Sequence, residues 1–118
     1  MAHFRFEDLE IWQMAKKLAI KFHKVADKLE QKKLYRYAEQ LRAAGLSVSN
    51  NIAEGSGSIH SKEFNQFLNI ARRSLFENAS MVLVFCDMEL LEENEKSELL
   101  EDCDFLSRKI TNYYKSRL

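Results

Sequence analysis

The sequence predicts an all-α protein that folds as an up-down-up-down, left-handed four-helix bundle. The first observation is composition, because the 118 residues include no proline and only three glycines, so few residues interrupt helices. The second is spacing: apolar residues recur at steps of three and four along four stretches, at about 7–29, 34–54, 60–91 and 94–117. Short connections between such helices favour antiparallel neighbours around one core. We therefore expect a single domain spanning residues 1–118.

The first helix is expected to begin at Glu7 or Asp8, where acidic side chains suit the positive end of the helix dipole. The second apolar series, which starts at Leu34, is offset by two positions from the first, and a straight helix cannot absorb that shift. The chain should therefore turn near residues 30–33. The core face of the first helix is traced by Ile11, Ala15, Leu18, Phe22, Val25 and Leu29.

The second helix should close at the run NNIAEGSG, where Gly55 is expected to be the left-handed residue that ends it. Gly45 lies in mid-helix on the core face, where glycine costs ~1 kcal/mol relative to alanine, so a neighbouring helix should approach its backbone closely. Glu54 lies at the negative end of the dipole and should need a cation from the same or another subunit. The candidate cations at that pole are Arg5, Lys115 and Arg117.

The third helix should start at a serine cap within residues 58–61 and continue to about Leu90. Its core face is interrupted by Asn78, and its second half is apolar on nearly every side, so it needs more cover than three neighbours give. This favours self-association. The fourth helix should begin at Asn94, a good capping residue. The candidate assembly residues are Trp12, Met81, Val84 and Met88.

Charge is balanced overall, with 18 basic and 18 acidic residues, but it is uneven along the chain. A lysine stripe repeats at helical spacing on the first helix, while residues 92–104 carry seven acidic groups and one basic group. The candidate nucleic-acid contacts are Lys17, Lys21, Lys24, Lys28 and Arg42. In an up-down bundle the end of the first helix lies beside the start of the fourth, so Lys24 and Lys28 would face acidic residues there. Internal pairing with Glu95, Glu98, Glu101 and Asp102 is the simpler interpretation, because it also accounts for the zero net charge.

Motifs give little support for an enzyme. None of the three histidines has the glutamate three residues earlier that di-iron bundles use, and neither His23 nor His60 has the upstream arginine of the bundle ribonucleases. The loop that ends at Lys62 lacks the preceding glycine and strand of a P-loop, so a plain helix–helix turn is the simpler interpretation than an anion site. Cys86 and Cys103 lack CxxC spacing and should be reduced thiols. We expect no metal and no cofactor, and an enzyme of unrecognised type is the second alternative.

No apolar run reaches the ~18–20 residues of a membrane span, and the first residues lack the apolar core of a signal peptide. The sequence therefore predicts a cytoplasmic protein without membrane contact.

Four segments together resemble one known family: FEDLEIWQMA at 6–15, QLR at 40–42, NIAEG at 51–55 and SKEFNQFLNIA at 61–71. The chain is similar to the four-helix-bundle proteins encoded in intervening sequences of bacterial 23S ribosomal RNA genes. A retroelement accessory variability protein is a distant, strongly basic relative of that family. The resemblance implies a bacterial protein, a ring-shaped homopentamer and no established catalytic activity. The family motif falls on Asn51, Ile52, Ala53, Glu54 and Gly55.

The sequence departs from the family pattern at several positions. No proline follows the first helix, and Ser49 stands where proline is common. Ala43 stands where a second arginine is common, which weakens a nucleic-acid role, and Arg73 replaces a frequent glycine, which argues against a close helix contact there. The function we expect is that of a non-enzymatic, pentameric interaction or scaffold protein of unknown cellular process. The alternative is an RNA- or DNA-associated accessory module that uses the lysine stripe and has nucleic acid or a nucleic-acid enzyme as its partner.

Overall fold

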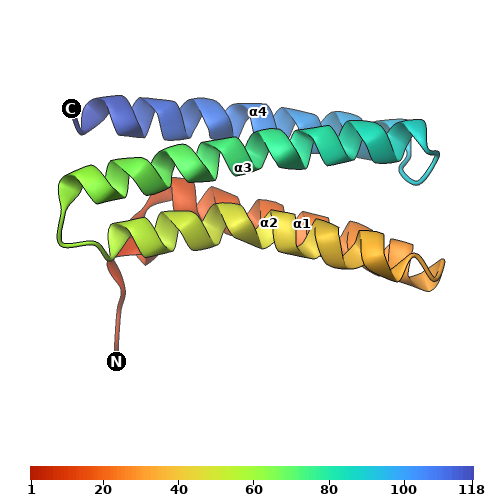
Figure 1. Cartoon of the computed structure of the whole chain (residues 1–118), viewed down its shortest axis with the longest axis horizontal. Coiled ribbons are helices and arrows are strands. Elements are labelled where there is room, and N and C mark those ends of the chain that lie inside the picture. The colour runs from red at the N-terminus through yellow and green to blue at the C-terminus, as the bar shows by residue number, and fades with distance from the viewer.

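The structure is a computed structural model that describes residues 1–118 as four long helices after a short 3-10 turn, η1 (Arg5–Asp8). The helices are α1 (Glu10–Gln31), α2 (Tyr35–Ser56), α3 (Ser61–Asp87) and α4 (Glu93–Ser116). They run alternately in opposite directions along a body 44 Å long (Figure 1). The predicted all-α, up-down four-helix bundle is therefore confirmed, while its left-handed sense stays a prediction.

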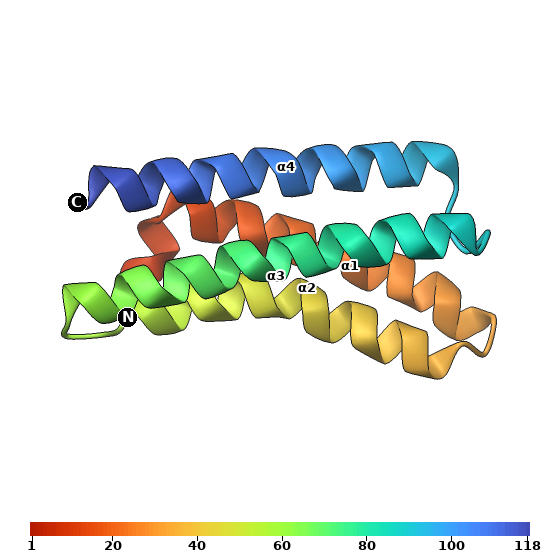
Figure 2. The same ribbon diagram turned by 45° about the horizontal axis from the view of Figure 1, so that its top comes forward.

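Both chain ends lie at one end of the bundle, together with the α2–α3 loop (Figure 2). We call this end the termini pole and the opposite end, which holds the α1–α2 and α3–α4 loops, the far pole. All four helices contribute to one hydrophobic core cluster. Every residue predicted on the core face of α1 is buried, and Phe22 and Leu29 are completely so. The helical spacing of apolar residues therefore identifies the core correctly.

The two turns at the far pole close in the same way. Lys33 after α1 and Glu89 after α3 adopt left-handed conformations, with φ of 64° and 63°. The amides of Leu34 and Leu90 then donate to carbonyl oxygens five residues earlier, at 3.0 and 2.9 Å. These are Schellman motifs, which usually contain glycine at the left-handed position. The turn predicted at residues 30–33 is confirmed, but α3 ends at Asp87, before the predicted Leu90, because the motif at Glu89 reverses the chain.

The prediction for Gly55 is wrong, since no glycine has a positive φ and Gly55 lies inside α2. Its lack of a side chain serves packing instead. A Cβ at this position would lie 2.6 Å from Cβ of Phe67 and 3.0 Å from Cδ1 of Phe64, both on α3. The close approach predicted at Gly45 is confirmed, because a Cβ there would lie 3.0 Å from Cβ of Phe22.

The helix starts differ from the expected caps. Glu7 and Asp8 lie in η1, one turn before α1. His60 precedes α3 without a side-chain cap, because the Ser58 hydroxyl accepts from the His60 amide within the loop. Asn94 lies inside α4, which starts at a capping box. In that box the Glu95 carboxylate accepts a hydrogen bond from the Glu92 amide at 3.1 Å. This gives a partner to a backbone N–H at the helix start that no carbonyl of the helix can reach.

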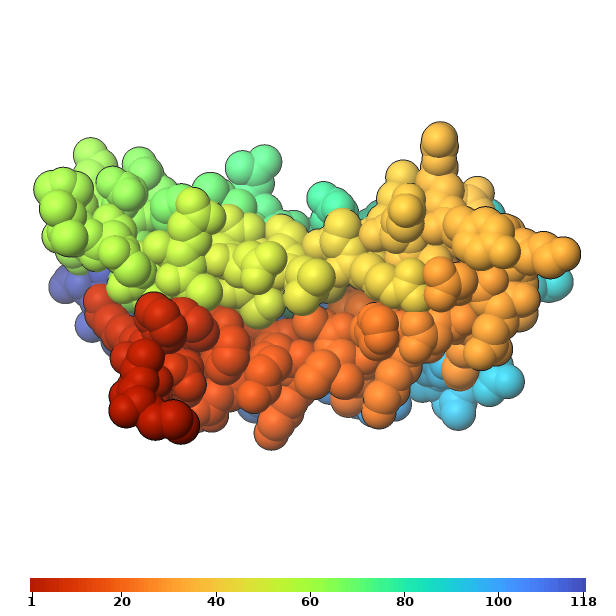
Figure 3. Space-filling model, turned by 90° about the horizontal axis from the view of Figure 1, so that it is seen from below, coloured from red at the N-terminus to blue at the C-terminus, as the bar shows by residue number.

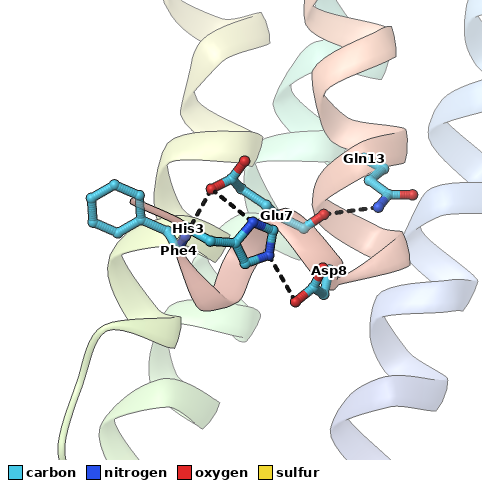
Figure 4. Close-up of polar contacts among 5 residues, drawn as sticks. All are labelled: His3, Phe4, Glu7, Asp8 and Gln13. Carbon is cyan, nitrogen blue, oxygen red and sulfur yellow. Dashed lines mark hydrogen bonds and ion pairs between the residues drawn. The ribbon is translucent and has the colours of Figure 1, made fainter. Parts of the chain in front are cut away.

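The N-terminal arm is held at the termini pole by short polar contacts (Figure 4). The Glu7 carboxylate accepts a hydrogen bond from the Phe4 amide at 2.7 Å, and the Gln13 side chain donates to the Glu7 carbonyl at 2.8 Å. Nε2 of His3 lies 3.0 Å from Oδ2 of Asp8. This hydrogen bond, aided by the charges of Asp8 and Glu7, raises the pKa of His3 above 6.5.

We expect a pH-dependent attachment of this arm. Since the folded-state pKa of His3 is raised, its contribution is fully present below pH 6.5 and is lost as the pH rises through the folded value. An NMR titration of the His3 ring should give a pKa above 6.5, and Asp8→Asn should move it down toward 6.5. A wild-type pKa at or below 6.5, or an unchanged value in Asp8→Asn, would contradict this contact.

Candidate functional site

The lysine stripe on α1 meets the acidic start of α4. Nζ of Lys21 donates to Oδ2 of Asp102 at 2.6 Å and to Oε1 of Glu98 at 2.8 Å, and Nζ of Lys28 donates to Oε2 of Glu95 at 2.6 Å. The hydrogen bond that Lys21 donates to Asp102 is the main reason that the pKa of Lys21 is raised. The predicted charge match between these helix ends is confirmed. Lys24, which was expected to face these acidic residues together with Lys28, has no ion pair. Lys21 pairs with α4 in its place.

Arg42 is also held within the bundle. Its terminal nitrogen donates to Oδ1 of Asp27 at 2.6 Å and to Oε2 of Glu30 at 3.1 Å, both on α1. Of the five candidate nucleic-acid contacts, only Lys17 and Lys24 therefore lack a carboxylate partner in the same chain. Phosphate would have to compete with these internal pairs at Lys21, Lys28 and Arg42.

The four candidate assembly residues divide into two groups. Trp12 and Met81 are partly buried against the core, and the Trp12 ring lies 4.8 Å from that of Phe6. Val84 on α3 is 50% exposed, and Met88, which directly follows α3, is 44% exposed. Besides Ile70, two further residues of α3 that the sequence did not identify are exposed, Phe76 and Leu83. Their seven-residue spacing places them on one stripe of the helix, and this is the signal that could have found them.

A second apolar surface lies on the face formed by α1 and α2, which Figure 3 shows with the N-terminal residues at one end. Ile20 and Leu46 are about half exposed there. They line an open groove of about 450 Å³ together with Trp12, Ala19 and Ala53. This groove and the outer side of α3 are distinct parts of the molecular surface.

The family motif at the end of α2 has mainly structural contacts. Ile52 is completely buried, and Asn51 donates to the Ser47 carbonyl at 2.7 Å, one turn earlier. The Ser47 hydroxyl in turn lies 2.9 Å from the Ser74 hydroxyl on α3. Together with Gly55, these contacts fix α2 against α3.

Glu54 is the exposed charge of this motif, and no cation of the same chain pairs with it. The predicted pairing within the chain is therefore wrong. Two of the expected cations lie instead over the Phe64 ring, with guanidinium carbons 5.2 Å (Arg5) and 4.2 Å (Arg117) from its centroid. Lys115, the third, also has no ion pair. A cation from another subunit remains a prediction.

The cysteines have little nucleophilic character. Burial raises the pKa of the Cys103 thiol to about 12. Burial and the negative charge of Glu93 also raise the pKa of the Cys86 thiol, which is partly exposed. Thiolate is the nucleophilic form, so neither is activated at neutral pH. No group of three or more His, Cys, Asp or Glu side chains has a geometry that could hold a metal ion. None of the helices combines the length and hydropathy that crossing a membrane requires.

Comparison with curated proteins gives no match. The family model described as 23S rRNA-intervening sequence protein matches residues 7–112, which include nearly all of the four helices. Apart from Phe6, the match also covers the four segments that carry the resemblance. The chain therefore belongs to the 23S rRNA-intervening sequence protein family.

Proposed function

We propose that this protein is a non-enzymatic, cytoplasmic interaction protein that assembles with copies of itself into a pentameric ring. The observation that supports it most is the presence of two exposed apolar surfaces on different faces. One is formed by Phe76, Leu83 and Val84 of α3 with Met88 just after it, and the other by the groove around Ile20 and Leu46. Ring assembly uses two different surfaces of each subunit, one docking into the other.

The size and exposure of the apolar side chains at residues 76–88 support the proposal that a second copy of the chain covers them. Four large side chains between 44% and 58% exposed lie within residues 76–88, three of them on α3 and the fourth, Met88, at its C-cap. Monomeric proteins rarely leave contiguous apolar patches of this kind in water. The groove between α1 and α2 offers apolar lining for such side chains. Glu54, which lacks a partner in its own chain, would gain a cation from the neighbouring copy.

Native mass spectrometry and sedimentation test the assembly. We expect a mass five times the 13.9 kDa of the chain, maintained in high salt because an apolar contact is not screened. The double variant Leu83→Glu, Met88→Glu should dissociate to single chains while its circular dichroism stays helical, because both side chains are already exposed. Glu63→Gln, an exposed control on the same helix, should leave the mass unchanged. A monomeric wild-type protein would overturn the proposal.

Glu54→Gln tests the ionic part of the contact separately. Since Glu54 has no partner within the chain, this change should weaken assembly without lowering the stability of the isolated subunit. Unchanged assembly would remove Glu54 from the interface and leave the apolar contact as the whole of the proposal.

The two alternatives have less support. A nucleic-acid role on the lysine stripe is weakened because Lys21, Lys28 and Arg42 already have carboxylate partners. An enzyme would need an activated nucleophile or base, and burial of the Cys103 thiol opposes its activation.

A further inference from the structure

The α3–α4 side of the termini pole carries a polar groove that the assembly does not explain. It has a volume of about 600 Å³, and Leu68 and Ile110 supply its apolar part. No carboxylate lines it. Its polar lining includes Lys62, Asn65, Asn69, Arg72, Thr111 and Tyr114. We propose that this groove binds the sugar-phosphate backbone of a single-stranded nucleic acid.

Arg72 is the central group of this site. Its guanidinium is partly buried, and Nε donates to the Thr111 hydroxyl at 2.9 Å. The Thr111 hydroxyl is itself fixed, because it donates to the Ser107 carbonyl at 3.0 Å. The guanidinium carbon of Arg72 lies 4.9 Å from the centroid of the Phe76 ring. No carboxylate pairs with Arg72, and its terminal nitrogens make no hydrogen bond within the chain. The side chain is therefore positioned in advance, with its best phosphate donors unused.

The surrounding charge favours an anion. Residues 61–77 and 107–117 together carry seven basic and two acidic residues, the reverse of the acidic stretch 92–104. Lys62, at the termini end of the groove, also has no ion pair. Of these seven cations, Arg108 and Lys109 pair with Asp104 and Glu10 of their own chain, whereas Lys62 and Arg72, which line the groove, have no ion pair.

The shape and the uncharged groups favour a single strand. Lys62 and Arg72 are ten residues apart on α3, or about 15 Å along the helix axis, so the groove has room for a few nucleotides. The side-chain amide of Asn69 lies between them and offers a neutral donor and acceptor, while Asn65 offers its NH2 group because its Oδ1 accepts from Nε of Arg117 at 2.9 Å. Tyr114 is 37% exposed beside the groove and presents an aromatic ring on which a base can stack.

Fluorescence anisotropy with labelled 12-nucleotide oligo-U and oligo-dT, at low and moderate salt, tests this site. Both oligonucleotides should bind, and affinity should fall steeply with salt. Arg72→Gln and Lys62→Gln should each weaken binding about ten-fold and reduce the salt slope by about one. Lys24→Gln, which removes an unpaired cation from α1, is the matched control and should change affinity less than about two-fold. A preference for one oligonucleotide identifies RNA or DNA as the source of the strand.

Three results would overturn the proposal: no binding by the wild-type protein at low salt, affinity that does not depend on salt, or equal losses in Arg72→Gln and Lys24→Gln. The native mass of each variant is measured in parallel, because the acidic α4 residues of a second copy are the competing occupant. If Arg72→Gln lowers the assembled mass and leaves oligonucleotide binding unchanged, the groove is a contact between copies. Failure of this site leaves the proposed assembly through the apolar surfaces intact.

Discussion

Asn78→Asp should lower the free energy of unfolding by about 3–5 kcal/mol at pH 7, because it places an unpaired charge in the core. Asn78 is completely buried where α3 faces α2. With its amide nitrogen turned toward them, Asn78 donates to the carbonyl oxygens of Ala44 at 3.0 Å and Ser74 at 3.2 Å. An ionised carboxylate would meet two acceptors and have no donor to offer.

The pH dependence of Asn78→Asp identifies the cause. Burial raises the pKa of the new carboxyl above its unfolded value of about 3.9, so the protonated form is favoured in the folded state. The loss of stability should therefore be smallest below about pH 4 and grow as the pH rises through the folded pKa. Chemical denaturation at several pH values measures it. Asn69→Asp, exposed on the same helix, should stay within ~0.5 kcal/mol of wild type. A loss below 1 kcal/mol at position 78 would show that this site is hydrated.

Gly55→Ala should destabilise the protein although alanine is the better helix former. Alanine gains ~1 kcal/mol of helix propensity at an interior position. The added methyl group, however, would lie 2.6 Å from Cβ of Phe67 and 3.0 Å from the ring of Phe64, which is buried. Neither atom is the end of a flexible side chain, so α2 and α3 must separate. Overpacking of this kind costs about 1–3 kcal/mol or more, and we expect a net loss of about 1–2 kcal/mol.

Gly57→Ala is the matched control, two residues away. Its φ is −83° and an added Cβ would lie 3.5 Å from the Glu54 carbonyl oxygen, an ordinary contact. Alanine should therefore stabilise the protein by up to ~1 kcal/mol through the unfolded chain. Thermal or denaturant unfolding of both variants gives the comparison. If Gly55→Ala were as stable as Gly57→Ala, close packing would not be the reason for glycine at position 55.

The sequence predicts helix interiors better than helix ends. The core face of α1 follows from the 3.6-residue period alone, and the phase shift locates the turn after it. The ends depend on caps that residue preferences do not reveal. Lys33 and Glu89 occupy positions that usually hold glycine, while Gly55 occupies one set by packing against α3. Local preference was overridden by tertiary contact at Gly55.

For similar reasons, the sequence predicts the candidate surfaces only in part. Topology alone places the acidic start of α4 beside α1, but the rotation of each helix decides that Lys21 pairs and Lys24 does not. Where α3 is apolar on several sides, periodicity cannot separate inward from outward residues. This is why Phe76 and Leu83 were missed. The α3–α4 groove combines residues about forty positions apart in sequence, such as Arg72 and Thr111, so no local motif could show it.

The contact between α1 and α4 has a consequence for how the chain is made. These helices share fewer contacts than any other adjacent pair of long helices, and ion pairs from Lys21, Lys28 and Lys109 span the seam between them. The better-packed α1–α2 and α2–α3 pairs are complete when the ribosome has synthesised three quarters of the sequence. On this basis we expect α1, α2 and α3 to associate first and α4 to dock last, on α3. Ion pairs from Lys21 and Lys28 of α1 would then hold α4 in the bundle once it has left the ribosome.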